Sequence, residues 1–365
     1  MTMTEWPEGR AVVYCQGALG TTNGKTAHGL IRRSERYDVT VVIDAAHAGR
    51  DGGELLDGHP NDIPVVADLT AALEAAERSG GPATHFVVGL APDGGRLPDF
   101  ARRDVIEALK AGLNVDSGLH DFLSEDDELA GLARENGVEI RDVRRTPPRS
   151  ELHFFDGRID EVTAFRVAVL GTDSAVGKRT TAWLLVDAWR AAGIHAELVG
   201  TGQTAWLQGA RKSIILDSLI NDFVAGEIEF AAWSCWQETG AGVIVLEGQG
   251  SLMNPAYPGG FELLAAARPH AVIMQHAPAR REYDGFPGFP LHDLPTQIHA
   301  VELISGRPVA AVTVNHEGLS PGEIPVVCAA ITAQTGLPAI DVLVEGAAGL
   351  VDALEPSRQS AVGRS

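Results

Sequence analysis

The residues best suited to chemistry stand close together between Gly171 and Thr181, in the run GTDSAVGKRTT. Gly171 and Gly177 let a loop curl so that several backbone N–H groups point inward at an anion, and Lys178 can reach its outer oxygens. The expected ligand is therefore a phosphate, carried by a nucleotide or cofactor. The loop residues expected to contact it are Gly171, Thr172, Asp173, Ser174, Ala175, Val176, Gly177, Lys178, Arg179, Thr180 and Thr181.

The loop departs in two ways from the common phosphate-binding pattern G-x-x-x-x-G-K-[ST]. Five residues lie between Gly171 and Gly177, where the pattern has four. Arg179 stands where a hydroxyl normally binds magnesium, so Thr180 or Thr181 would have to serve in its place. The alternative interpretation is a Gly-rich turn between a strand and a helix, with Lys178 in solvent.

A magnesium ion held against phosphates needs acidic partners. Glu247 follows the apolar run 242–246 and precedes Gly248, which places a carboxylate at the end of an expected strand. Asp217 and Asp222 are weaker candidates, because both also fit ordinary helix-surface or capping acids. The expected metal ligands are Thr180, Asp217, Asp222 and Glu247.

Two further polar groups follow expected strands of the second half. Gln203 lies in the turn TGQT after the run 196–199, and Asn315 follows the run 309–314. Because the carboxyl ends of parallel strands share one edge, both are expected to contact the cofactor. The amide of Asn315 can read an adenine edge through a paired donor and acceptor, or it can simply form a turn.

Basic groups follow the apolar run 271–274. His276 is placed to act as a general base near the same edge. Arg280 and Arg281 suit a substrate carboxylate or phosphate, or else pair with acids on the surface. The stretch EYDGFPGFP at 282–290 fits either a lid or a packed loop.

The first half carries weaker signals. Its first strand leads into a Gly-rich loop, but the loop fits neither the phosphate-binding pattern nor G-x-G-x-x-G. Asp44 follows the second strand, where a ribose-binding acid would stand. Lys25 and His120 are expected substrate contacts, with a surface or core role as the alternative for His120.

Short β-branched runs alternate with helical patterns along the whole chain, which is typical of parallel sheets with crossover helices. The sequence predicts an α/β protein with a Rossmann-like domain over 1–150 and a P-loop NTPase-like domain over 151–355, each with a mostly parallel sheet flanked by helices. The boundary is placed at the Pro-containing stretch RRTPPRSELHFFD. A small, polar and flexible tail is expected over 356–365.

The composition limits the partners. The net charge of -20 disfavours a polyphosphate backbone, so nucleic acid is not an expected partner. No apolar run is long enough to span a bilayer, and the N-terminus lacks the pattern of a signal peptide, so the expected location is the cytoplasm. Cys15, Cys235 and Cys328 stand far apart, which favours reduced thiols over disulfides or a zinc site.

The loop GTDSAVGK resembles that of dethiobiotin synthetases, which share its five-residue spacing. In that family the Glu of a Glu-Gly-x-Gly segment helps to bind magnesium, which implies this role for Glu247. An adenine-reading Asn corresponds to Asn315. This resemblance covers only the second half of the chain.

A second resemblance covers nearly the whole chain. The segments KTA at 25–27, SGLH at 117–120, TGQT, NDFVAGEIE and EGQGS are similar to those of the D-glutamate N-acetyltransferase family. This resemblance implies acetylation of a D-amino acid with acetyl-CoA, and it implies that Lys178, Thr180, Glu247 and the TGQT turn contact a nucleotide or CoA phosphates. The stretch NPAYPG at 254–259 departs from the family's His-Pro-Gly-like segment. A homo-oligomer is also an expectation from such relatives.

The leading hypothesis is an enzyme that binds ATP with Mg²⁺, or acetyl-CoA, and transfers an acyl-type group to the amine of a small amino-acid-like metabolite. Lys178, Glu247 and His276 are then the catalytic residues. An ATP–Mg²⁺-dependent ligase or kinase is one alternative. A nucleotide-gated regulatory protein is a second alternative, of another class.

Overall fold

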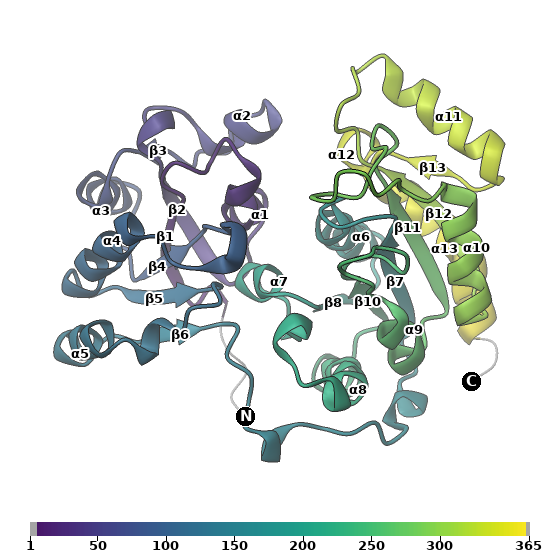
Figure 1. Cartoon of the computed structure of the whole chain (residues 1–365), viewed down its shortest axis with the longest axis horizontal. Coiled ribbons are helices and arrows are strands. Elements are labelled where there is room, and N and C mark those ends of the chain that lie inside the picture. The colour runs from purple at the N-terminus through teal and green to yellow at the C-terminus, as the bar shows by residue number, and fades with distance from the viewer. Residues whose placement is uncertain (1–5, 363–365) are drawn as a thin grey trace. The chain divides into compact units, whose positions relative to one another are not determined.

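The computed structural model describes residues 6–362, which divide into two compact units. The N-terminal unit comprises residues up to Thr146 together with Gln203–Gly209. The P-loop unit comprises Pro147–Gly202 and the residues from Ala210 onward. Figure 1 labels the elements of each unit.

The N-terminal unit is built on a six-stranded sheet in the order β3-β2-β1-β4-β5-β6, with every pair parallel. This order is that of a Rossmann-like fold. The strands are β1 (Gly9–Tyr14), β2 (Tyr37–Ile43), β3 (Val65–Val66), β4 (His85–Val88), β5 (Asn114–Ser117) and β6 (Ile140–Asp142). The helices are α1 (Lys25–Arg32), α2 (Gly52–Asp57), α3 (Leu69–Arg78), α4 (Asp99–Lys110), α5 (Asp127–Asn136) and α7 (Gln203–Gln208).

The P-loop unit has a seven-stranded sheet in the order β13-β12-β11-β7-β10-β8-β9, again with every pair parallel. Its strands are β7 (Phe165–Gly171), β8 (Ala196–Gly200), β9 (Lys212–Ser213), β10 (Val243–Glu247), β11 (Ala271–His276), β12 (Val309–Val314) and β13 (Ala339–Ile340). Its helices are α6 (Lys178–Ala191), α8 (Asn221–Thr239), α9 (Phe261–Ala267), α10 (Leu294–Ser305), α11 (Glu323–Thr335), α12 (Val342–Glu345) and α13 (Ala348–Val362).

The α/β fold expected from the sequence is confirmed in both units. The buried runs form the central strands, because a parallel strand covered on both faces must be apolar throughout. The short edge strands β6, β9 and β13 were not predicted. They have only two or three residues each, which is too few for an apolar pattern.

Helix α7 belongs to the N-terminal unit although its sequence lies between β8 and β9. The guanidinium of Arg36 stacks on Trp206 at 3.6 Å and lies 4.5 Å from the Trp6 ring. The Arg36 Nε donates to the Trp206 carbonyl at 2.8 Å, and Gln208 Nε2 donates to the Gly29 carbonyl. The domain predicted over 151–355 is therefore interrupted by a segment that packs in the other unit.

The flexible tail predicted from residue 356 is a helix over its described part. Helix α13 continues through Pro356 to Val362, and residues 363–365 lie outside the described residues. Leu350 and Leu354 are fully buried and anchor the helix, while Arg358 pairs with Glu355 across one turn. The polar composition of the tail concealed this anchor, because the buried leucines precede it.

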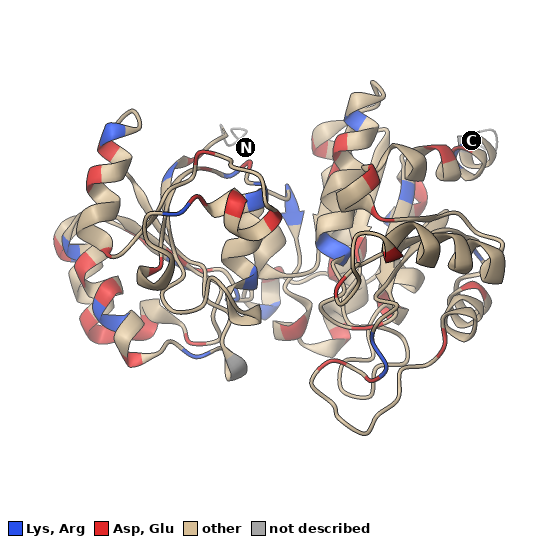
Figure 2. Ribbon diagram, turned by 90° about the horizontal axis from the view of Figure 1, so that it is seen from above, with Lys and Arg blue, Asp and Glu red and all other residues tan. Residues whose placement is uncertain are grey.

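Figure 2 shows that the acidic residues are distributed over both units rather than gathered in one place. Among the described residues, no helix combines the length and apolarity that crossing a membrane requires. Cys15, Cys235 and Cys328 are all buried and unpaired, as the sequence predicted.

Candidate phosphate-binding site

The predicted loop connects β7 to α6 at the centre of the second sheet. Gly177, the residue before α6, has φ of 101°, which a side chain would strain. Ala175 also adopts a positive φ, 52°, so the chain turns sharply at two points. A Cβ on Gly171 would stand 2.9 Å from the Val176 side chain, so the loop folds back over its first residue. The sequence prediction of a strand, a curled loop and a helix is confirmed.

The backbone amides of this loop fall into two groups. Thr172 donates to the Gln275 carbonyl and Ser174 donates to Asp173, so these two amides are satisfied. Within the described part of the chain, the amides of residues 175–178 hydrogen-bond no protein group. They adjoin the first turn of α6, where the helix dipole adds partial positive charge. Successive open amides at a helix N-terminus form a binding site for an anion such as phosphate.

The side chain of Lys178 is folded against its own loop. Its Nζ donates to the carbonyls of Asp173 at 2.7 Å and Gly250 at 2.8 Å. Burial lowers the pKa of Lys178 to about 8, although the charges of Glu247 and Asp173 oppose the shift. Both carbonyls are neutral, so a phosphate would offer this ammonium a stronger partner than it now has.

Asp173 ties the loop to two other segments. Its carboxylate is fully buried and accepts hydrogen bonds from Asn254 Nδ2 at 2.9 Å and from the Asp284 amide at 2.8 Å. Arg280 donates to it at 3.1 Å and also donates to the Ser174 carbonyl. The carboxylate therefore faces the protein, and its role is to hold the loop in shape. The sequence predicted that Asp173 contacts a cofactor directly, but in this structure its carboxylate binds protein groups instead.

Glu247 lies at the end of β10, which pairs directly with β7. Its carboxylate accepts a hydrogen bond from the Thr201 amide at 3.2 Å. Burial raises the pKa of Glu247, and the charges of Arg179 and Lys178 act against this shift. The strand-end acid predicted from the sequence therefore stands beside the loop.

The other predicted metal ligands are not gathered around Glu247. Asp217 is exposed in a short 3-10 helix, and Asp222 is exposed in the first turn of α8. Among the residues whose side chains the structure describes, no three His, Cys, Asp or Glu groups are arranged to hold a metal ion. The physical reason is that both acids face solvent at the start of helical segments, as their alternative interpretation had it.

The hydroxyl groups around the loop are largely engaged. Thr181 donates to Gln275 Oε1, and so does Thr313. Thr172 Oγ1 hydrogen-bonds the His276 ring at 3.0 Å. Burial lowers the pKa of His276 to about 4, so the imidazole is neutral at neutral pH. Thr180 is half-buried in the first turn of α6.

The two predicted arginines differ in their surroundings. Arg280 bridges Asp173 and Glu317, with its side chain 14% exposed. Arg281 is exposed, and its side chain makes no ion pair with a described acid. Asn315 donates to the Val176 carbonyl at 2.9 Å and accepts from the Glu317 amide. The Asn315 side chain was expected to contact a cofactor. In this structure its amide instead holds the phosphate-binding loop through the Val176 carbonyl.

Three predicted residues lie in the N-terminal unit. Lys25 and His120 are exposed, at the start of α1 and just after β5. Gln203 begins α7 and packs against Gly118, where an added Cβ would approach its side chain to 2.6 Å. Next to it, the hydroxyls of Thr26 and Thr204 are 3.2 Å apart. Residues of KTA and SGLH and the last two residues of TGQT thus converge in this unit, and Gln203 is not a member of the P-loop unit.

The first-half loop after β1 is closed by protein groups. Asp44 is fully buried and accepts hydrogen bonds from the amides of Leu19 and Ala46. The amide of Ala27 in α1 donates to the Gly89 carbonyl. The carboxylate predicted as a ribose contact therefore shapes its own loop.

Sequence reasoning missed two residues that hold the P-loop. Gln275 accepts the Thr172 amide with its backbone and two threonine hydroxyls with its side chain. Asn254 is buried, donates to Asp173 and accepts from the amides of Ala256 and Tyr257. The signal that the sequence offered for Asn254 was that the stretch 254–259 departs from the corresponding segment of the family it resembles.

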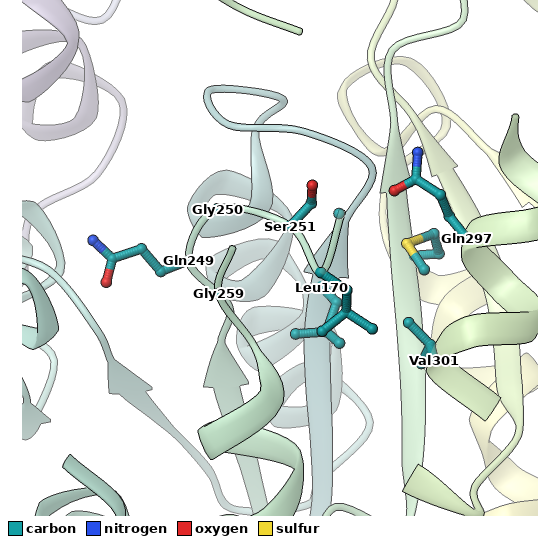
Figure 3. Close-up of a pocket in the computed structure, with 10 residues that line it drawn as sticks. Leu170, Gln249, Gly250, Ser251, Gly259, Gln297 and Val301 are labelled. Atoms are coloured by element: carbon teal, nitrogen blue, oxygen red, sulfur yellow. The ribbon is translucent and has the colours of Figure 1, made fainter. Parts of the chain in front are cut away.

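A small cavity lies beneath the loop (Figure 3). It leaves only about 10 Å³ for the centre of a water molecule, which is room for one water and not for a cofactor. The Ser251 Oγ is buried without a hydrogen-bond partner among the described residues, and a water here could satisfy it. The residues that line the cavity are Leu170, Gly171, Gln249, Gly250, Ser251, Leu252, Gly259, Met274, Gln297 and Val301.

These two units and the open loop define a class: two-domain proteins with an N-terminal Rossmann-like domain and a C-terminal P-loop domain. A family model described as "Domain of unknown function (DUF1611_N) Rossmann-like domain" matches residues 45–146. A second, "Domain of unknown function (DUF1611_C) P-loop domain", matches residues 153–351. The chain belongs to the DUF1611 family.

Two named relatives and a solved structure are similar to this chain over most of its length. A D-glutamate N-acetyltransferase of Tritonibacter scottomollicae is 30% identical over 295 residues, which are 77% of this chain and 84% of the relative. A protein of the same name from Pseudoalteromonas is 30% identical over 74% of this chain and 80% of its own. The crystal structure of a DUF1611 family protein from Anabaena variabilis has a TM-score of 0.84 and 29% identity, covering 95% of this chain and 99% of that one. The chain is thus similar to acetyltransferases over most of its length.

Proposed function

We propose that this protein transfers the acetyl group of acetyl-CoA to the amine of a small amino acid, with D-glutamate as the first substrate to test. One observation carries the proposal: two relatives that share 30% identity over about three quarters of this chain are both named D-glutamate N-acetyltransferase. The open amides of 175–178 support it, because CoA carries phosphates that such a site can bind.

In this reaction the amine nitrogen attacks the thioester carbonyl carbon. The C–N bond forms as the C–S bond breaks, CoA leaves as a thiolate that takes up a proton, and the attacking amine loses one. A good base for this step has a pKa near the working pH. The pKa of His276, which burial lowers to about 4, argues against it as this base. We infer instead that His276 helps to position the loop, because its ring hydrogen-bonds Thr172.

Within the P-loop unit, Arg281 is the candidate for recognising a substrate carboxylate. It is exposed and forms no ion pair with a described acid, whereas Arg280 is held by Asp173 and Glu317. A guanidinium binds a carboxylate through two parallel hydrogen bonds. Loss of Arg281 should therefore weaken the binding of an acidic amino acid more than that of acetyl-CoA.

The test measures CoA thiol release and the acetylated product with D- and L-glutamate, D- and L-aspartate and glutamine. We expect release with an acidic D-amino acid, and Arg281→Ala should raise the KM for that substrate with little change in the KM for acetyl-CoA. Arg307→Ala is the matched control, because Arg307 is also an exposed arginine of this unit. If no amino acid stimulates CoA release, and ADP appears with ATP instead, acetyl transfer is wrong and a ligase or kinase is supported.

A further inference from the structure

The residue after the loop lysine is unusual for a P-loop. In the common pattern this residue is Ser or Thr, and its hydroxyl binds the magnesium ion that accompanies the phosphates. Here it is Arg179, in the first turn of α6. Magnesium requires oxygen ligands in a nearly octahedral arrangement, and a guanidinium has none to offer. The position that normally recruits the metal therefore carries a positive charge of its own.

The neighbouring threonines do not replace the missing hydroxyl. Successive residues of an α-helix point about 100° apart, so Thr180 and Thr181 face other directions than residue 179. The Thr181 hydroxyl is in addition committed to Gln275 Oε1. Thr180 remains half-buried, rotated away from the direction in which the usual hydroxyl points.

The acid that would complete a magnesium site is already balanced by protein cations. Glu247 is 8% exposed and interacts with the charges of Arg179 and Lys178, and the Thr201 amide donates to its carboxylate. The Nε of Arg179 is buried, so at least this part of the guanidinium is shielded from solvent, while the residue as a whole is half-buried. Among residues 6–362, no further acids gather with Glu247 to form a metal site.

The charges around the loop also favour an anion without a metal. Three cations, Lys178, Arg179 and Arg280, accompany two buried acids, Asp173 and Glu247, which leaves a net charge of +1. Two further acids act on Arg280, Glu317 and Asp284, but Glu317 is 60% exposed and Asp284 is exposed as well, so water screens both charges.

We propose that the side chain of Arg179, held by Glu247, takes the place of magnesium, so that this loop binds a phosphate-bearing ligand without a divalent cation. The magnesium role expected of Thr180 from the loop pattern, and implied for Glu247 by the resemblance to dethiobiotin synthetases, does not fit these residues. The inference rests on the proposed function only in taking CoA as the phosphate-bearing ligand. Its consequence is that phosphate binding and acetyl transfer proceed in the presence of a metal chelator.

The experiment measures CoA binding to the full chain by calorimetry, once with MgCl₂ and once with EDTA. For the unmodified protein we expect affinities that agree within about twofold in the two conditions. Arg179→Thr restores Gly-Lys-Thr. It should bind CoA at least about tenfold more weakly in EDTA, because it loses a charged hydrogen-bond donor. Part of that loss should be recovered with MgCl₂.

Three controls separate charge, hydroxyl and folding. Arg179→Lys should keep binding in EDTA, and Arg179→Met should lose affinity without any recovery in MgCl₂. Arg190→Thr changes an arginine at the other end of the same helix, paired with Glu197, and should bind CoA like the unmodified protein. Each variant is compared by its circular dichroism spectrum and melting temperature, so that unfolding is not mistaken for weak binding.

The outcomes distinguish this inference from the proposed function. CoA binding in EDTA without acetyl transfer to any amino acid would contradict the proposed function and leave the inference standing. A clear loss of affinity in EDTA, or Arg179→Thr binding like the unmodified protein without magnesium, would overturn the inference. Failure of CoA, ATP and inorganic phosphate to bind in either condition would overturn it as well.

Discussion

Replacement of Asp173 by asparagine tests whether the loop is held by its own carboxylate. One carboxylate oxygen accepts from Asn254 and the Ser174 amide, and the other accepts from Arg280 and the Asp284 amide. An amide NH₂ in place of either oxygen would face two donors. The group is fully buried, so water cannot compensate for the lost acceptor.

The expected cost follows from the burial of this ion pair. Removal of one partner of a buried pair costs about 3–5 kcal/mol. Each kcal/mol lowers the melting temperature of a unit of 150–250 residues by about 2–4 °C, so Asp173→Asn should lower that of the P-loop unit by roughly 6–20 °C. The P-loop unit falls within this size range. Scanning calorimetry of the full chain measures the shift.

The matched control is Asp116→Asn in the N-terminal unit. Asp116 is likewise fully buried and accepts hydrogen bonds from Arg141 and Tyr37. Both variants should be destabilised, but only Asp173→Asn should lose affinity for CoA, because only Asp173 shapes the loop. A melting temperature for Asp173→Asn within about 2 °C of the unmodified protein would refute the argument, since that corresponds to less than about 1 kcal/mol.

Three other predictions follow from single contacts. CoA affinity should fall as the pH rises above about 8, because burial lowers the pKa of Lys178 to about 8 and binding a phosphate requires the charged form of the lysine. The CoA affinity of Lys178→Arg should not change with pH up to about pH 10, because arginine stays charged. A CoA affinity of the unmodified protein that does not change with pH would contradict this prediction. Gly226→Ala should lower the melting temperature, because the added Cβ would lie 2.0 Å from the His153 carbonyl oxygen. Gly131→Ala should raise the melting temperature slightly, because no packing neighbour lies within 4 Å of the added Cβ and alanine favours the helix. Equal shifts for the two variants would contradict the packing argument. Arg36→Ala should destabilise the N-terminal unit by at least about 2 kcal/mol, because it removes the stacking on Trp206 and also the buried guanidinium that pairs with Glu8; urea unfolding measures this, and no change in midpoint would contradict it.

The strands and the phosphate loop could be predicted because their signals are local. Buried parallel strands read as continuous apolar runs, and the loop is defined by two glycines and a lysine within one stretch of chain. The position of Glu247 was predictable for the same reason, since it is the last residue of a single apolar strand and therefore lies at the carboxyl end of the sheet. Each of these inferences uses the properties of consecutive residues only.

The remainder depended on contacts between distant residues. Trp206 stacks on Arg36, 170 residues away, and this contact assigns α7 to the N-terminal unit. Asp173 meets Asn254 and Asp284 across 81 and 111 residues. The sequence shows that a carboxylate stands in the loop but not which donors surround it. For this reason the sequence predicted that Asp173 contacts a cofactor, whereas in the structure its carboxylate stabilises the loop.

The protein groups that hold this loop determine which chemical groups a ligand must provide. The two buried acids, Asp173 and Glu247, already have cationic or amide partners, which agrees with the proposal that this loop binds its ligand without a metal. Among the described residues of the loop, the amides of 175–178 donate to no protein group, and the ammonium of Lys178 donates hydrogen bonds to neutral carbonyls. All of these are donors, and their best complement is an oxygen-rich anion. The loop is thus shaped in advance for a phosphate, and binding it requires little rearrangement beyond movement of the lysine.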